Sequence, residues 1–146
     1  MNLPAYLKSV GYIEVPVTIT RVNHIVVHAR VNGEDVVLIV DTGASRTCIA
    51  ESCAERLGLI SGRVEEVAVS FALPKKTKAS SKLESLDIAS LHLTDFETWI
   101  VDFSYINIIV QWQGEEFCDG VLGADILISK SAVIDYKCRK LYLKDA

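Results

Sequence analysis

Short apolar runs and stretches in which apolar and polar residues alternate are spread along the whole chain and are separated by polar turns. This pattern is typical of β-strands. It predicts strands over 10–20, 24–31, 36–40, 46–50, 64–73, 83–93, 96–103, 132–136 and 140–143. It also predicts short helices over 51–58 and 124–129, whereas 105–112 fits either a strand or a turn of helix. The predicted fold class is therefore all-β with two short helices.

The run 36–40 is five apolar residues long, is predicted to be buried on both faces, and ends in an acid, Asp41. Burying an ionised carboxylate without partners costs several kcal/mol, so the residues that follow should hold it. In the segment Asp41–Ser45, Thr42 offers a hydroxyl, and Gly43 allows a turn that points its amide back toward the acid. The next two residues are small and leave space in front of the carboxylate.

The pair Asn32-Gly33 lies between the predicted strands 24–31 and 36–40. An Asn-Gly pair between two apolar runs is the strongest short-range indication of a β-hairpin. Asp41 is therefore expected at the end of the second arm of a hairpin.

A second motif comes late in the chain, where Asp119–Leu127 reads DGVLGADIL. The hairpin, the apolar strand and Asp41–Ser45 together resemble the active-site segment of retropepsin-like aspartic proteases, and Thr47 stands where that family commonly has Thr. Asp119–Leu127 resembles the family's other signature, an apolar strand that ends in Gly, crosses behind the catalytic loop and opens a helix. The resemblance is to a cellular or bacterial single-lobe member.

The resemblance implies a single retropepsin-like domain over residues 1–146, built as a closed barrel, with 1–10 as a mobile N-terminal segment. It implies an aspartic endopeptidase in which Asp41, Thr42 and Gly43 form the catalytic motif. In such an enzyme the Thr42 side chains would bond across a two-fold axis, and the amide of Gly43 would bind the carboxylate.

Hydrolysis by carboxylates needs two of them, which share one proton because adjacent like charges do not both ionise. The chain has one Asp-Thr-Gly motif, and 119–121 and 123–125 have the wrong order of acid, hydroxyl and glycine. Asp125 is expected at a helix surface or cap. The second carboxylate is then Asp41 of another copy, which requires a homodimer. The resemblance suggests that extended N-terminal residues and Lys140–Leu143 interleave in its interface.

The chain departs from the viral pattern at two charged positions, which here are Ser45 and Ala124. Both charges are lost together, so neither is left without a partner. The residues expected to line the peptide cleft, with a preference for apolar side chains at the cut, are Ala44, Ser45, Cys48 and Val121. Residues 74–82 are predicted as a hairpin tip, the counterpart of the family's flap at about 70–85, although the glycine-rich tip is missing.

Composition and charge argue against several other classes of function for this chain, nucleic-acid binding first. The chain has 146 residues, a net charge of −4 and a pI near 5.3, which argue against a nucleic-acid-binding surface. No signal peptide or membrane span is indicated, so a soluble, cytoplasmic protein is expected. The resemblance to aspartic proteases implies a peptide or protein substrate. The four cysteines show no metal-ligand spacing, and His24 and His28 lack a third ligand, so no metal or cofactor is expected.

Two other interpretations stay open. The first is a dimeric β-barrel of the same fold that has lost hydrolysis and binds a peptide, for example by adding it as a strand. The second is that Asp41 is a structural turn residue in an unrelated barrel, which would leave the match at 119–127 to chance.

Overall fold

The computed structural model describes residues 1–60, 64–67, 76–104 and 118–145, of which 64–67 and 76–78 are described by their backbone alone. Its helices are α1 (Leu3–Ser9), the 3-10 turn η1 (Glu51–Cys53) and α3 (Ala124–Ser129). Its strands are β1 (Tyr12–Pro16), β2 (Thr18–Ile19), β3 (Ile25–Val31), β4 (Glu34–Val40), β5 (Cys48–Ala50), β6 (Val64–Val67), β7 (Lys76–Ile88), β8 (Leu91–Val101), β9 (Gly120–Leu122), β10 (Val133–Asp135) and β11 (Lys140–Lys144).

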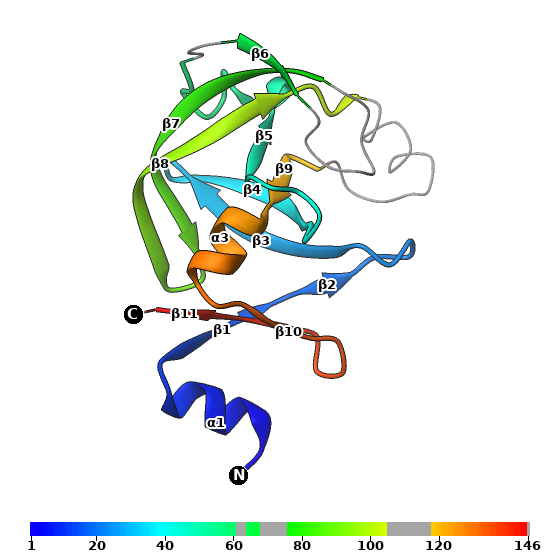
Figure 1. Cartoon of the computed structure of the whole chain (residues 1–146), viewed down its shortest axis with the longest axis vertical. Coiled ribbons are helices and arrows are strands. Elements are labelled where there is room, and N and C mark those ends of the chain that lie inside the picture. The colour runs from blue at the N-terminus through cyan, green and yellow to red at the C-terminus, as the bar shows by residue number, and fades with distance from the viewer. Residues whose placement is uncertain (61–63, 68–75, 105–117, 146) are drawn as a thin grey trace.

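Six of the strands form a closed barrel, which occupies the upper part of Figure 1. The larger sheet has the order β2-β3-β4-β9-β5-β8-β7-β6, and β3 also pairs with β7 through Arg30↔Asp87 and Val31↔Leu86. This pairing closes the ring β3-β4-β9-β5-β8-β7. The predicted class, an all-β closed barrel with short helices, is confirmed.

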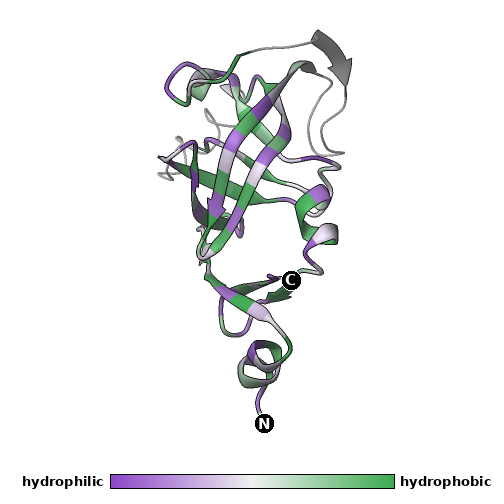
Figure 2. Ribbon diagram, turned by 90° about the vertical axis from the view of Figure 1, so that its left-hand side faces the viewer, coloured by the Kyte–Doolittle hydropathy of each residue, from purple (hydrophilic) through white to green (hydrophobic). Residues whose placement is uncertain are grey.

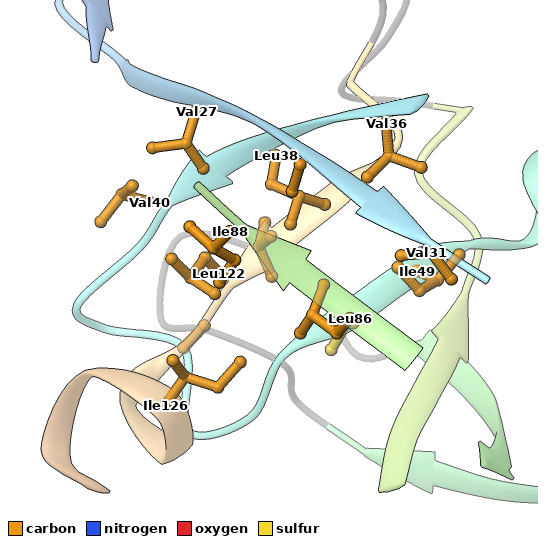
Figure 3. Packing of buried hydrophobic residues seen from close by; sticks show 14 of the residues in the cluster. Val27, Val31, Val36, Leu38, Val40, Ile49, Leu86, Ile88, Leu122 and Ile126 are labelled. Carbon is orange, nitrogen blue, oxygen red and sulfur yellow. The ribbon is translucent and has the colours of Figure 1, made fainter. Parts of the chain in front are cut away.

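The interior of the barrel holds the hydrophobic core. Figure 3 shows side chains from β3, β4, β5, β7, β9 and α3 pointing into one shared interior, and Figure 2 shows the alternation of apolar and polar positions along the strands. In β4 the inward residues are buried, whereas Val37 and Ile39 on the other face are half-buried. The strand at 36–40 is therefore confirmed, but the expectation that both of its faces are fully buried is wrong.

The turn between β3 and β4 is the predicted Asn-Gly hairpin. Asn32 has φ 51° and Gly33 has φ 82°, the positive values that a two-residue turn of this kind needs. The backbone register runs from Val31↔Glu34 to Val26↔Ile39. Asp41 therefore follows the last residue of β4, as expected.

A second sheet, with the order β1-β11-β10, lies between the barrel and α1 (Figure 1). The C-terminal strand β11 is its central strand and pairs with β1 on one side and β10 on the other. Both of its edges are therefore taken by its own chain. The N-terminal residues are also not extended, because Leu3–Ser9 form α1, where Asn2 Oδ1 accepts a hydrogen bond from Ala5 N at 3.0 Å.

Other predictions need correction. Residues 76–82 were expected in a polar hairpin tip but belong to β7, which pairs with β8 over most of its length. A long backbone ladder does not need apolar side chains, so polarity alone misplaces such a strand. The predicted helix over 51–58 contains η1 followed by turns, and it ends at Gly58 with φ 69° as expected. Residues 68–75, with the tip of the proposed flap, and 105–112 lie outside the described residues.

Candidate active site

The loop that carries Asp41 connects two strands that are not neighbours in the sheet. Strand β9 lies between β4 and β5, parallel to the first and antiparallel to the second. The chain between Val40 and Cys48 therefore has to cross the end of β9, where Gly123 follows Leu122. This crossing brings the two sequence motifs together, although they lie about eighty residues apart.

Glycine is required at position 123 because a side chain would not fit at the crossing, and not because of its backbone conformation. Its φ of −98° and ψ of −177° are extended values that any residue adopts. A Cβ atom at this position would lie 2.5 Å from the backbone carbon of Arg46 and 2.8 Å from Thr47 N. Backbone on both sides leaves no flexible group that could move aside. The glycine of the second motif thus sets how closely the loop packs on β9.

Asp41 lies at the start of this loop and is half-buried. Its backbone N–H donates to Leu122 O at 3.0 Å, and its Oδ1 accepts a hydrogen bond from Gly43 N at 2.9 Å. Ala44 N donates to the carbonyl of Asp41 at 3.2 Å, which closes the turn. The turn expected at Gly43 is therefore present, and Thr42 and Gly43 are exposed next to the carboxylate.

The second half of the loop is fixed by Asp125, which the sequence had suggested only as a surface or capping residue. Its Oδ1 accepts hydrogen bonds from Thr47 N at 2.9 Å, from Thr47 Oγ1 at 2.8 Å and from Ile126 N at 2.8 Å. The buried Thr47 hydroxyl in turn accepts a hydrogen bond from Gly123 N at 3.0 Å. The capping expectation is partly correct, but the larger role of Asp125 is to hold the loop through Thr47.

Strand β8 fixes the same loop from the other side. The buried Thr98 donates its hydroxyl to Thr47 O at 2.9 Å, and Trp99 N donates to the same carbonyl at 3.4 Å. The guanidinium of Arg46, which is exposed, lies 5.3 Å from the centre of the Trp99 ring. None of these contacts is visible in the sequence, because β8 lies about fifty residues after the loop.

The four residues expected to line the cleft have different environments in the single chain. Ser45 is exposed. Ala44, Cys48 and Val121 are buried, with exposed fractions of 0%, 0% and 3%, and Ala44 O accepts a hydrogen bond from Ala124 N at 2.7 Å. Their assignment to substrate binding stays a prediction, and their side chains here pack beneath the loop.

Asp119, at the start of the second motif, is a structural residue. Its Oδ2 accepts a hydrogen bond from Val37 N at 2.7 Å, and its Oδ1 lies 3.6 Å from Arg56 Nη2. The Cys53 thiol also donates to Oδ1 at 3.2 Å, and burial, followed by this contact, raises the pKa of Cys53. Burial raises the pKa of Cys118 to about 11. Both thiols are therefore protonated at neutral pH.

Within the described part of the chain, His, Cys, Asp and Glu do not gather in groups of three or more that could hold a metal ion. Across the same residues, no helix has both the length and the apolar character that crossing a membrane requires.

A family model described as aspartyl protease matches residues 27–126, which include both motifs and the crossing between them. The chain belongs to the aspartyl protease family. No relative was found among curated proteins. The match spans the barrel strands from β3 to β9 and reaches Ile126 of α3.

Solved structures show that this aspartyl protease domain has the fold of a retropepsin-like lobe. It is similar to a retropepsin-like aspartic protease from Rickettsia conorii, with 22% identity and a TM-score of 0.59 over 91% of this chain and 89% of that chain. It is also similar to the retroviral protease-like domain of Ddi1 from Leishmania major, with 17% identity and a TM-score of 0.58 over 84% and 90%. The EIAV protease complexed with the inhibitor HBY-793 has 15% identity and a TM-score of 0.54 over 82% and 99%.

Proposed function

We propose that the protein is an aspartic endopeptidase that works as a homodimer, with one Asp41 carboxylate from each subunit. The observation that supports this most directly is the position of Asp41 in an aspartyl protease domain. Its carboxylate is half-buried, bound by the Gly43 amide and held on a loop that packs against β9 and α3. An acid held in this way keeps its geometry without losing access to water.

The chemistry requires a second carboxylate, and the other two acids of the motifs are already engaged. Asp125 binds Thr47, and Asp119 binds Val37 N and Arg56. Neither is therefore available to share a proton with Asp41 of the same chain. In the dimer, one ionised Asp41 takes a proton from a water molecule while the other, protonated, donates to the scissile carbonyl. Because one of the pair must be protonated, activity is expected to be highest below neutral pH.

The roles of the neighbouring residues follow from the same arrangement. Thr42 is exposed beside the carboxylate, where its hydroxyl would bond across the two-fold axis, and Gly43 orients the acid through its amide. Ser45 would contact the peptide directly, while Ala44, Cys48 and Val121 would shape the cleft from beneath. No cofactor or metal takes part in this mechanism.

In the single chain β1 pairs with β11 along one edge, and β10 pairs with it along the other from Lys140 to Tyr142. The proposed dimer contact therefore does not use β11 as an interleaved end strand. We place the contact at β10, which is an edge strand of its sheet and follows α3 closely. Two exposed apolar residues flank it, Ile128 on α3 at 77% exposure and Tyr136 at 64%. Antiparallel pairing of β10 with its copy would continue the sheet across the two-fold axis. A reducing, cytoplasmic location is also proposed, in keeping with four cysteines that form no disulfide bond.

The substitution Asp41→Asn tests the function. Asparagine keeps the shape and the acceptor for Gly43 N but not the proton exchange, so peptide cleavage should fall on the order of 10³-fold. Folding and dimerisation, followed by circular dichroism and light scattering, should not change. The matched control is Asp35→Asn, an exposed acid at the opposite end of β4 from Asp41 that accepts a hydrogen bond from Arg30 Nε.

Mixed dimers sharpen the test. Parent and Asp41→Asn subunits carrying different affinity tags are co-expressed, and the hybrid is isolated by two purification steps. A shared dyad predicts that the hybrid has no more activity than the double-Asn dimer. A hybrid with half the parental rate would contradict a shared site, and peptide binding without any cleavage by the parent would support the inactive binding module instead.

A further inference from the structure

Arg46 is a positive charge on the loop that carries Asp41, in a protein with a net charge of −4. Its side chain is exposed, and its guanidinium lies over the Trp99 ring at 5.3 Å. No carboxylate among the described residues forms an ion pair with it. A guanidinium on an aromatic face keeps its N–H groups directed outward, where a planar carboxylate binds them in pairs.

The backbone of Arg46 is fixed in place. Gly123 packs directly against its carbonyl, Cys48 Sγ donates to Arg46 O at 3.3 Å, and the next residue, Thr47, is bound by Asp125 and Thr98. The ring beneath the guanidinium is also positioned, since Trp99 pairs with Cys48 in the register of β5 and β8. The backbone that carries the Arg46 side chain is therefore held in place by these contacts.

Arg46 follows Asp41 by five residues, and this short connection limits the distance between them. Five residues of chain span at most about 17 Å even when fully extended, so the Arg46 backbone lies within that distance of Asp41. An extended peptide advances about 3.3 Å per residue. A side chain of a bound peptide within about five residues of the cut is then in reach of the guanidinium.

We propose that Arg46 is a specificity-determining residue that binds an acidic side chain of the peptide substrate, Asp or Glu, within about five residues of the scissile bond. This inference rests on the proposed function, because it places the peptide at Asp41. The two-fold axis supplies two copies of Arg46, so the acidic preference is expected on both sides of the cut. The acidic preference would apply to peptide positions farther from the scissile bond, in addition to the apolar preference expected at the residues that flank it.

The alternative is that Arg46 only stabilises the loop by packing on Trp99. The two roles differ in what the substitutions change. A packing role predicts that Arg46→Ala and Arg46→Glu lower stability or activity equally for all peptides. A recognition role predicts that they change the choice between peptides.

The first experiment measures cleavage of a synthetic decapeptide library with randomised positions, with products identified by mass spectrometry. The parent should enrich Asp and Glu on both sides of the cut, and Arg46→Ala should reduce this preference about tenfold, as expected for a charged hydrogen bond. Arg46→Lys should keep part of the preference, and Arg46→Glu should favour Lys and Arg. An unchanged profile in Arg46→Ala and Arg46→Glu would overturn the inference.

Arg30→Ala is the matched control. Arg30 is also an exposed arginine, but it pairs with Asp35 at the opposite end of β4 from Asp41. Its removal should leave the cleavage profile unchanged. If this variant lost the acidic preference as well, the effect would come from net charge and not from the site, which would overturn the inference.

The second experiment measures binding without cleavage, in the Asp41→Asn background. Peptides retained from the same library by the immobilised protein are compared with their Glu→Gln counterparts by fluorescence anisotropy. A preference for Glu that disappears in Asp41→Asn/Arg46→Ala supports the inference even if the parent cleaves nothing, in which case only the proposed function fails. Equal binding of the Glu and Gln peptides, or no retained peptide, overturns the inference, and cleavage by the parent would then leave the proposed function standing.

Discussion

The loop Asp41–Thr47 and the three-stranded sheet β1-β11-β10 differ in how far their backbone hydrogen-bonding groups are paired within the single chain. The loop is bound from two sides, by Asp125 and Gly123 of the second motif and by Thr98 of β8. In the sheet, the central strand β11 is paired on both sides, whereas β10 is an edge strand with one side unpaired among the described residues. The loop is therefore held by contacts within one chain, whereas β10 leaves a strand edge at which a second chain could pair.

This difference predicts which substitutions should change stability and which should change association. Changes around the loop remove contacts that the single chain already makes, so they should lower the free energy of unfolding. Changes on the exposed residues beside β10 remove little buried surface of the single chain, so they should alter association and activity more than folding.

Gly123→Ala should have the largest effect on stability. A Cβ atom would meet the Arg46 backbone at 2.5 Å, so β9 and the loop have to move apart, at a cost of at least about 3 kcal/mol. Urea unfolding followed by circular dichroism measures the loss. The control is Gly11→Ala beside β1, where φ is +93° but nothing lies within 4 Å of the added atom, and the expected cost is about 1 kcal/mol. Similar losses for the two variants would contradict the close crossing.

Asp125→Ala should come second. It leaves Thr47 N and the buried Thr47 hydroxyl without their shared acceptor, which costs about 2 to 3 kcal/mol. Asp125→Asn keeps an acceptor oxygen and should cost about 1 kcal/mol. The matched change in the sheet, Asp135→Ala, removes one hydrogen bond to Cys138 N and should cost about 0.5 to 1 kcal/mol in the same unfolding assay. If Asp125→Ala were no worse than Asp135→Ala, the loop would not depend on this anchor.

The double substitution Ile128→Glu/Tyr136→Glu should change the unfolding free energy least, by about 0.5 kcal/mol or less, because both side chains are exposed in the single chain. It should nevertheless produce a monomer without cleavage activity, since acidic groups on both sides of a two-fold contact repel each other. Light scattering and a peptide assay measure the two effects.

The matched control is Leu3→Glu/Tyr6→Glu on α1, where both residues are also exposed. It should stay dimeric and active. If this control dissociated the dimer and the Ile128/Tyr136 variant did not, the contact would lie on α1 and the assignment to β10 would be wrong.

The features that were predictable from the sequence are those encoded by neighbouring residues. The hairpin at Asn32-Gly33 needs two adjacent residues that tolerate positive φ, and the turn at Gly43 needs only the residues around Asp41. The second motif was recognisable because an apolar strand, a glycine and a helix start follow each other directly. Such local patterns leave few alternative structures, so the all-β class and the position of the acid followed from them. The closed barrel was expected from the resemblance of the two motifs to retropepsin-like proteases.

Other features were missed because their partners lie far apart in the chain. The strand segment 76–82 looked like a loop because its residues are polar, yet β6 and β8 supply its hydrogen-bond partners. Asp125 looked like a surface acid because Thr47 lies 78 positions away. The contact of Arg46 with Trp99 had no counterpart in any local pattern, because the two residues lie about fifty positions apart.

The sequence by itself determined the all-β class, the hairpin and the acid at its end, because each depends on residues that are adjacent in the chain. Only the tertiary structure decided that β1 and β10 pair with the two edges of β11, that Asp125 anchors the loop, and that Arg46 lies over Trp99. The physical reason for the last two is that β9 is inserted between β4 and β5, and that β5 pairs with β8, which brings together side chains that lie far apart in the sequence.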